Sequence, residues 1–393
     1  MSIVTESLSA RDRARFLEAA RVAGLWYRHN QNAPGQPWGG VDQSADLGRY
    51  LYEYFPATGQ CRGTGVWSQA IASVALLYLD EAFKDSELGF REAAERGIGY
   101  LKSLQYLDSR NAKAYGGFRE HNPQTVWSYP RDGATGCFGL AVWARETGDA
   151  DALERADLFC KWYSSHGSAG DVWPDCEYRF DTGEGEPKVR GDWQAGGGLC
   201  YYYTARAAKD EKWIEKGFRP MMEILAQIGD PSDVDGVESG WHGQSRITVG
   251  NDDFATVALL AAFLTFDDEK FLDVARKRVS YYLSLQAEDG SFPNYGGTFV
   301  TALTLLDFAQ LATERQLPDD MGPVIDALLK AAYFGLSLQC TEHRDRRAYG
   351  GLWGQSSFGV GRDRIHNRST TYATHLWLRL AGHRAPCLSA LGW

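Results

Sequence analysis

The stretch LSLQAEDGSFPNYGGTF, residues 283–299, joins two helices and decides the fold. Apolar residues at three- and four-residue spacing lead into it, which predicts an amphipathic helix that ends at the turn signal DGS. A nearly all-apolar helix, TFVTALTLLDFAQLAT, then leaves it. The same pattern recurs as LKSLQ and AYGGF within residues 101–118, and as LSLQ and AYGGLW within residues 336–353. The Gln-to-Tyr spacings of 10, 9 and 10 residues predict a repeated helical hairpin.

Two kinds of helix alternate along the whole chain. One kind is amphipathic, which is typical of a helix that packs on a core with one face. These predicted outer helices cover residues 11–27, 88–105, 150–162, 212–228, 269–286 and 322–339. The other kind is apolar on every side, which is typical of a buried helix. These predicted inner helices cover residues 65–79, 133–144, 192–205, 252–265, 298–313 and 369–381. The pattern predicts an all-α fold of six hairpins, with residues 1–393 in a single domain.

The connections between these helices differ strongly in length. Short turns lead from each inner helix to the next outer helix, as expected for antiparallel neighbours. Long segments lead from outer to inner helices and cover residues 29–64, 106–132, 166–191, 229–250, 287–297 and 340–368. Long irregular loops in a compact protein are uncommon unless they are functional. We therefore expect all six on one face, over the N-termini of the inner helices, and the functional site among them.

The composition excludes several classes of protein. The formal net charge is −10, whereas a nucleic-acid or anionic-membrane partner would require a clustered basic excess. Seven cysteines occur without CxxC spacing, which favours a reduced compartment over a disulfide framework. The N-terminus lacks the apolar run of a signal peptide, and no 18-residue uncharged apolar stretch occurs. We expect a soluble cytoplasmic protein with no membrane or nucleic-acid partner.

The long loops and the starts of the inner helices combine aromatic residues with Arg, His and Asn. Aromatic faces stack on sugar rings, while polar groups bind hydroxyls and carboxylates. The predicted substrate-binding residues are Trp38, Arg131, Trp193, Trp241, Arg347, His366 and Asn367. Arginine is frequent in these loops although the chain is acidic, and its planar guanidinium suits a carboxylate. This favours an acidic oligosaccharide or polysaccharide as the substrate. The alternative is that the loop arginines pair with loop Asp and Glu as structural ties.

Acidic or amide residues stand where inner helices are predicted to begin. They are Asp132, Asp192, Asp252 and Asn367. Such residues commonly cap a helix by accepting hydrogen bonds from free backbone N–H groups. Alternatively, carboxylates gathered around one axis can act as acid and base. Asp252 and Asp253 cannot both be caps, so one of this pair is a catalytic candidate.

Proton transfer can also involve His242 and the repeated tyrosines. His242, in ESGWHGQSR, is either a proton-transfer group near neutral pH or a hydrogen-bonding loop residue. Tyr295 and Tyr349 precede Gly-Gly in the repeat, where a tyrosine packs the turn between outer and inner helix. Beside Arg347 or His366, such a tyrosine could instead act as a base.

Several well-known motifs are absent. The chain has no P-loop, no dinucleotide-binding GxGxxG after a strand, no GxSxG, no HExxH and no EF-hand loop. We therefore expect no cofactor and no metal ion. The triplet Gly196-Gly197-Gly198 falls inside a predicted inner helix, where it allows close approach of a neighbouring backbone or a ligand.

The six hairpins with long loops on one face resemble the (α/α)6 toroid superfamily over essentially the entire chain. Within it, unsaturated glucuronyl hydrolases and toroid polysaccharide lyases are most similar in their aromatic and Arg-rich loops. The segment VRGDWQAGGG, residues 189–198, is similar to an RGNGW-like segment of the glucuronyl hydrolases, with Asp192 in place of Asn. The LSLQ and EDGSF segments are also similar to repeats of terpene cyclases and prenyltransferase β subunits. Two features argue against the terpene cyclases and prenyltransferases: Asn251-Asp252-Asp253 is not a DxDD motif, and no Asp/Cys/His zinc set stands out in the sequence.

Three functions remain as hypotheses. The first is cleavage of a uronate-containing glycan, mainly by β-elimination, in which His242 or a tyrosine removes the C5 proton and Arg or Asn neutralises the carboxylate. A hydrolytic version would use Asp192 and Asp252 as paired carboxylates. The second is a terpenoid cyclase, which requires an apolar, aromatic-lined cavity. The third is a non-catalytic, glycan-binding toroid.

Overall fold

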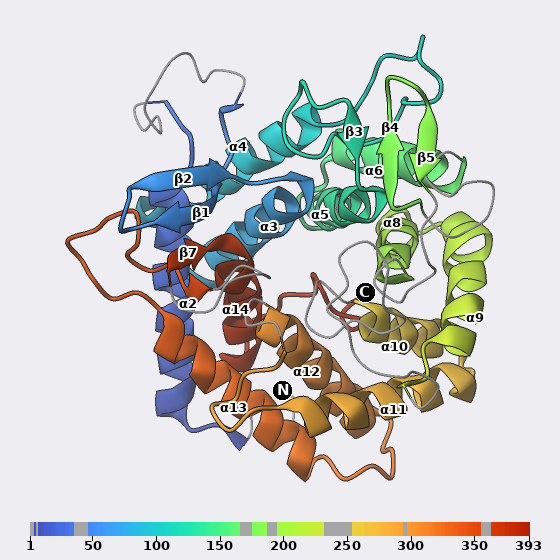
Figure 1. Cartoon of the computed structure of the whole chain (residues 1–393). Helices are drawn as coiled ribbons and strands as arrows, with labels where there is room; N and C mark the ends of the chain where they lie inside the picture. The colour runs from blue at the N-terminus through green and yellow to red at the C-terminus, as the bar shows by residue number, and fades with distance from the viewer. Residues whose placement is uncertain are drawn as a thin grey trace.

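Six antiparallel helix pairs form two concentric rings in the computed structural model, within the residues that it describes (Figure 1). Those residues are 4, 7–34, 46–165, 175–186, 195–231, 254–293, 297–354 and 363–393. The outer ring consists of α2 (Ala10–Asn30), α4 (Phe90–Ser103), α6 (Ala150–Ser165), α9 (Arg219–Ile228), α11 (Glu269–Leu285) and α13 (Gly322–Leu338). The inner ring consists of α3 (Val66–Phe83), α5 (Pro130–Thr147), α8 (Leu199–Ala208), α10 (Ala255–Phe266), α12 (Thr298–Glu314) and α14 (Asn367–Leu380). The predicted six hairpins are confirmed.

Burial explains why the two rings have different sequences. All of residues 255–263 in α10 are buried, so an inner helix must be apolar on every side. In α4, only residues at three- and four-residue spacing are buried, and the charged face meets solvent. Among the described helices, none is both long enough and apolar enough to cross a membrane.

Two helices begin differently from the sequence prediction. The outer helix predicted from residue 212 contains a π-helical turn, Ile214–Phe218, before α9. Pro220 has no N–H to donate, and a wider turn before it accommodates the missing hydrogen bond. The triplet Gly196–Gly198 forms a 3-10 turn ahead of α8. An added Cβ on Gly196 would lie 3.0 Å from the Phe254 backbone nitrogen, which confirms the predicted close approach of a neighbouring backbone.

The long loops contain short strands that join them to one another. One sheet has the order β2-β1-β7-β6, and the other has the order β3-β4-β5. The strands are β1 (Leu51–Phe55), β2 (Gln60–Gly63), β3 (Trp127–Ser128), β4 (Glu177–Arg179), β5 (Glu184–Glu186), β6 (Trp353–Gly354) and β7 (Arg364–His366). The first sheet joins the first and sixth long loops, and the second sheet joins the second and third. A hydrogen bond from Val66 N at the start of α3 to Glu120 O in the second long loop (2.9 Å) connects these two pairs of loops. These four loops therefore gather over the starts of α3, α5 and α14.

In each repeat, a glutamine side chain connects consecutive outer helices and also binds a glycine carbonyl. We call this the Gln-Gly repeat. The amide Nε2 of a Gln donates to a carbonyl of the next outer helix at Gln31 to Ala93 (2.9 Å), Gln105 to Arg155 (2.9 Å), Gln286 to Ala327 (2.8 Å) and Gln339 to Ala19 (2.9 Å). The same Nε2 groups donate to the carbonyls of Gly48, Gly116, Gly290 and Gly350, whose φ angles are between +90° and +102°. The bond from Gln339 to Ala19 joins the last outer helix to the first and closes the ring.

Each repeat glycine is required by a close contact as well as by its left-handed backbone. A Cβ on Gly350 would lie 2.3 Å from the Val22 carbonyl oxygen, and one on Gly48 would lie 2.1 Å from that of Arg96. The Gln31 copy of the repeat does not stand out in the sequence, because 17 residues separate Gln31 from Gly48 whereas 11 separate Gln105 from Gly116.

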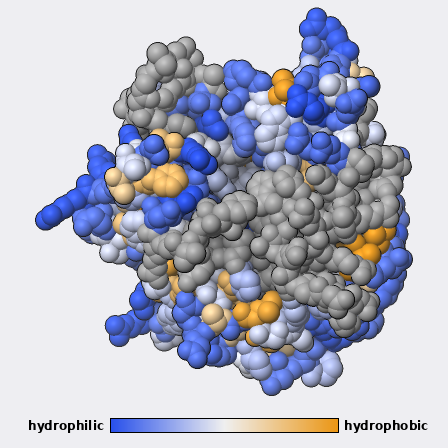
Figure 2. Space-filling model, in the orientation of Figure 1, coloured by the Kyte–Doolittle hydropathy of each residue, from blue (hydrophilic) through white to orange (hydrophobic). Residues whose placement is uncertain are grey.

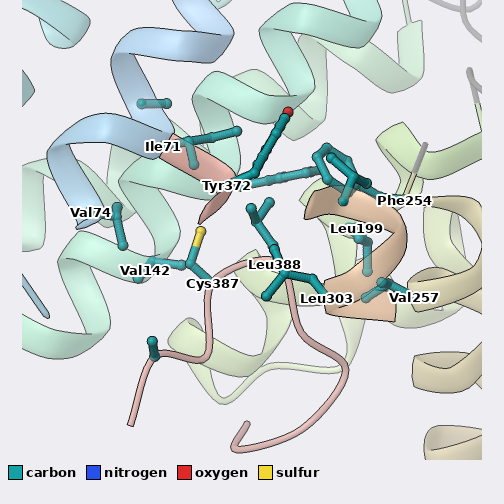
Figure 3. Close-up of a cluster of buried hydrophobic side chains, with 14 of the residues drawn as sticks. Ile71, Val74, Val142, Leu199, Phe254, Val257, Leu303, Tyr372, Cys387 and Leu388 are labelled. Atoms are coloured by element: carbon teal, nitrogen blue, oxygen red, sulfur yellow. The ribbon is translucent and has the colours of Figure 1, made fainter. Parts of the chain in front are cut away.

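The end of the inner ring opposite the long loops is closed by residues 381–393. Cys387 and Leu388 are buried among apolar side chains from the inner helices (Figure 3). Asp307 of α12 holds this segment, because its carboxylate accepts hydrogen bonds from Ser389 Oγ (2.7 Å) and Ala390 N (2.6 Å). We call residues 381–393 the C-terminal plug.

Candidate active site

Two carboxyl groups, of Glu120 and Asp132, meet at the N-terminal end of α5. Glu120 is 2% exposed and Asp132 is 8% exposed, and Asp132 raises the pKa of Glu120 through its charge and through a side-chain hydrogen bond. Two ionised carboxylates repel each other, so this arrangement favours protonation of one of them. Glu120 Oε2 also accepts a hydrogen bond from Tyr129 N (3.2 Å).

Burial is the main reason that the pKa of Glu120 lies well above its usual value, and the charge of Asp132 raises it further. Glu177 of β4 acts in the same direction. The pKa of the Tyr129 phenol is also raised, by burial and then by these three carboxyl groups. The Glu120–Asp132 pair therefore retains a proton at a pH at which an exposed glutamate has lost it.

The local sequence places Asp132 inside the first helical turn. Pro130 begins α5, Tyr129 occupies the N-cap position, and no side chain caps the helix. The prediction that Asp132 caps the helix is therefore wrong. The positive end of the helix dipole favours a negative charge in the first turn, so Asp132 is the favoured anion of the pair and Glu120 the favoured acid.

Four aromatic rings pack in a row near the starts of three inner helices, and three of them, Trp67, Phe254 and Tyr372, are buried. Ring centroids are 5.9 Å apart for Tyr52 and Trp67, 6.2 Å for Trp67 and Tyr372, and 6.1 Å for Tyr372 and Phe254. In the view of Figure 2, the described surface is predominantly hydrophilic, with only small separate hydrophobic patches.

A second polar cluster, formed by Glu53, Arg364 and His366, lies where β1 pairs with β7. Arg364 Nη1 is 2.9 Å from Glu53 Oε1, and His366 Nε2 is 3.6 Å from the same oxygen. Burial, then Arg368 and Arg364, lower the pKa of His366 to about 3. This imidazole is therefore neutral, and its Nδ1 accepts a hydrogen bond from Arg368 N (3.1 Å) as the cap of α14.

Two predicted binding residues have contacts that hold the protein together. Asn367 is fully buried; its Nδ2 donates to Leu51 O (3.0 Å) and its Oδ1 accepts from Thr371 Oγ1 (2.9 Å). The prediction that Asn367 caps α14 is wrong, because His366 occupies that position. Arg131 is also fully buried, and its Nη1 donates to Thr135 Oγ1 (2.6 Å).

The structure places Arg347 and Tyr349 beside the outer helix α2. The Arg347 carbonyl accepts a hydrogen bond from Trp26 Nε1 (2.8 Å). The Tyr349 ring packs on His343 with centroids 4.3 Å apart, and its phenol interacts electrostatically with Arg21. These contacts match the packing role that the repeat favours for Tyr349. Its catalytic role remains a prediction.

The remaining predicted site residues lie outside the described part of the chain. They are Trp38, Asp192, Trp193, Trp241, His242, Asp252 and Tyr295. Their roles stay predictions.

Several loop arginines pair with acidic neighbours, as the alternative interpretation expected. Salt bridges join Arg49 to Asp46, Arg62 to Glu53, Arg110 to Asp108, Arg179 to Asp181, and Arg364 to Glu53 and Asp363. Within the described ranges, no group of three or more His, Cys, Asp or Glu residues could hold a metal ion.

Sequence reasoning missed Glu120, although the repeat contains a signal for it. Glu120 follows the repeat glycine Gly116 by four positions, as Tyr52 follows Gly48. Both residues adjoin the start of α3: a Cβ on Gly65 would lie 3.3 Å from Glu120 Oε1, and Tyr52 packs on Trp67. Aligning the repeats on their glycines relates Glu120 to Tyr52, although the residues at the same position in the other two repeats are Asn294 and Gly354.

No protein-family model and no curated protein sequence matches the chain. Solved structures do match. Cellobiose 2-epimerase from Spirochaeta thermophila DSM 6192 is 16% identical, with a TM-score of 0.67 and coverage of 96% of this chain and 98% of the epimerase. Unsaturated glucuronyl hydrolase from Bacillus sp. GL1 is 13% identical, with a TM-score of 0.66 and coverage of 98% and 100%.

The GH76A alpha-1,6-mannanase from Salegentibacter sp. HEL1_6 is 15% identical, with a TM-score of 0.63 and coverage of 93% of this chain and 99% of the mannanase. At these identities the likeness establishes the fold. The chain therefore has the (α/α)6 toroid fold that these carbohydrate-active enzymes share, as its sequence predicts.

Proposed function

We propose that this protein is an enzyme that hydrolyses a glycosidic bond, with the Glu120–Asp132 pair as the general acid. The observation that supports this most strongly is the burial of two carboxyl groups, Glu120 and Asp132, the second of which raises the pKa of the first. A carboxyl group that keeps its proton near neutral pH can donate it to a leaving glycosidic oxygen. The sugar-processing enzymes with the same fold add support.

The closeness of the two carboxyl groups assigns them a single role. Acid and base of a glycosidase stand roughly 5 to 10 Å apart, on either side of the scissile bond. Hydrogen-bonded carboxyl groups are closer than that, so Glu120 and Asp132 together supply one proton. A second carboxylate is then needed to activate water or attack the sugar. Asp192 and Asp252, predicted at the starts of inner helices, are the candidates for this role.

The competing functions fit the described residues less well. A terpenoid cyclase needs an apolar cavity, whereas two buried carboxyl groups lie by the start of α5 and a Glu-Arg-His cluster lies by the start of α14. The β-elimination predicted from the sequence depends on His242 or a tyrosine; His242 and Tyr295 lie outside the described residues, and Tyr349 packs beside α2. A purely glycan-binding toroid would not require a shared proton.

Incubation with neutral, amino-sugar and uronate oligosaccharides tests the proposal. Hydrolysis releases reducing ends without new ultraviolet absorbance, whereas elimination also produces an absorbing unsaturated uronate. We expect reducing ends without that absorbance, and their loss in Glu120→Gln. An absorbing product that persists in Glu120→Gln would instead favour elimination, and unchanged sugars throughout would favour a binding protein.

A further inference from the structure

A cavity of about 250 Å³ lies at the closed end of the inner ring, where α12 and α14 meet the C-terminal plug. The side chains in its wall that can carry a charge are Arg379, His383 and Arg384, and no Asp or Glu of the described residues lines it. Both arginines are positively charged at any physiological pH and carry only hydrogen-bond donors. The wall of this cavity therefore offers donors and positive charge to a ligand.

Arg379 is the buried part of this wall. It is 7% exposed, and its Nη2 donates to Asp307 Oδ1 and to Gln310 Oε1, both at 2.6 Å. Its Nη1 is buried and has no hydrogen-bond partner among the described residues. Native proteins rarely leave a buried N–H group without an acceptor, because such a group has lost its hydrogen bonds to water. Two contacts thus hold the guanidinium in place, while the N–H groups of Nη1 still lack acceptors.

Arg384 brings a second guanidinium to the same cavity from the plug. Its Nη1 donates to Glu146 Oε2 (2.6 Å), and its Nη2 is 3.5 Å from the Gly392 carbonyl oxygen. The side chain is 47% exposed, so a ligand from solvent can reach it. The acidic partners of the two arginines, Asp307 and Glu146, do not line the cavity. A ligand in the cavity therefore contacts the arginines and neither carboxylate.

We propose that this cavity binds a small oxyanion, a phosphate or a carboxylate group, through Arg379 and Arg384. Guanidinium groups form charge-assisted hydrogen bonds with such groups, and these bonds are stronger than those between neutral groups. An oxyanion also supplies acceptors for the N–H groups of Arg379 Nη1. The site lies at the end of the ring opposite the Glu120–Asp132 pair, so this inference goes beyond the proposed function and does not depend on it.

Calorimetry of the full-length protein tests the site with sodium phosphate and sodium acetate, each compared with sodium chloride at the same ionic strength. We expect a single saturable site for one or both oxyanions and none for chloride. Tighter binding of phosphate assigns a phosphate ligand, and tighter binding of acetate assigns a carboxylate. The bound oxyanion should also raise the melting temperature, because it binds only the folded chain. If neither phosphate nor acetate binds, the inference is overturned.

Two variants locate the binding. Gln310→Glu keeps the acceptor that holds Arg379 and adds a negative charge to the wall of the cavity. We expect it to raise the dissociation constant of the oxyanion at least about tenfold. Arg384→Gln removes the second guanidinium and should weaken binding by a similar factor. It also carries the test if Gln310→Glu does not fold. Full binding by the folded variants would overturn the inference.

Matched controls make the same two changes at exposed positions of the long loops. Gln60→Glu adds a negative charge, and Arg110→Gln removes a guanidinium whose side chain is 89% exposed. Both should leave the dissociation constant unchanged, and equal effects of controls and cavity variants would overturn the inference. These assays contain no sugar. Failure of oxyanion binding therefore leaves the proposed hydrolysis intact, and failure of hydrolysis leaves the oxyanion site intact.

Discussion

Glu120 and Asp307 are buried carboxyl groups at opposite ends of the inner ring, with 2% and 0% exposure. Their partners differ. Asp307 pairs with Arg379 (2.6 Å) and accepts hydrogen bonds from Ser389 and Ala390 of the C-terminal plug. Asp132 raises the pKa of Glu120, and the carboxylate of Glu120 accepts a hydrogen bond from the Tyr129 amide. Equal burial thus gives a structural anion at the closed end and an acid at the loop face, because the partners decide which protonation state is stable.

The largest expected effect is on activity at the loop face. Glu120→Gln should lower the turnover number by about 10² to 10⁴-fold, because Gln keeps the shape but cannot donate the acid proton. Its free energy of unfolding should not fall, since the substitution removes a buried titrating group. Steady-state kinetics and urea unfolding measure the two quantities. A variant that is fully active, or that loses activity only by unfolding, would contradict the role of Glu120.

At the closed end of the ring, we expect a loss of stability instead of a direct loss of catalysis. Asp307→Ala should lower the free energy of unfolding by about 3–5 kcal/mol, because Arg379 is left buried without its counter-ion. Ser389→Ala, which removes one hydrogen bond to Asp307, should lower it by only about 1 kcal/mol. Urea unfolding of both variants provides the measurement. A small effect of Asp307→Ala would show that the C-terminal plug does not depend on this carboxylate.

Gln339 tests whether every hydrogen-bonded polar side chain near the loops serves catalysis. Gln339→Ala should lower the free energy of unfolding by about 1–3 kcal/mol, because the Ala19 and Gly350 carbonyls lose their shared donor. The turnover number of the folded variant should remain unchanged. The exposed Gln60 provides a control, and Gln60→Ala should change stability by less than about 0.5 kcal/mol. Loss of turnover without loss of stability would contradict a structural role.

The smallest expected effect is a pH dependence of the stability difference between the wild-type protein and Glu120→Gln. The pKa of Glu120 is raised in the folded state. Its contribution to the free energy of unfolding is therefore fully present below the pKa that Glu120 has in the unfolded chain. That contribution is lost as the pH rises through the folded pKa. The stability of the wild-type protein relative to Glu120→Gln should therefore fall as the pH increases above the range of an ordinary glutamate. Urea unfolding at a series of pH values measures this difference, and a difference independent of pH would contradict the raised pKa.

The ring architecture was predictable because it depends on patterns that are local in sequence. Helical spacing separates the outer helices, such as α4, from the all-apolar inner helices, such as α10. The unequal connections place the loops on one face. The role of the Gln-Gly repeat needed the structure, because the carbonyl that Gln339 binds belongs to Ala19 at the other end of the chain.

The site was less predictable, because the partners of its charged groups are distant in sequence. Asp132 was selected as a helix-start residue, but its partner Glu120 belongs to a loop and is identified only by their contact. The expected caps failed at Asp132 and Asn367 because the helices begin one to three residues earlier than an Asp or Asn cap would require. The acidic substrate inferred from the frequency of arginine in the loops stays a prediction, although Arg364 and other loop arginines have acidic neighbours.

Infrared spectroscopy at neutral pH tests the shared proton most directly. A buried, protonated carboxyl group has a C=O stretching band distinct from that of carboxylates. We expect this band in the wild-type protein at neutral pH and its loss in Glu120→Gln. The band should persist in Asp307→Asn, whose substituted carboxylate is paired with Arg379. Absence of the band from the wild-type protein, or its persistence in Glu120→Gln, would contradict the assignment of Glu120 and Asp132 as a proton-sharing pair.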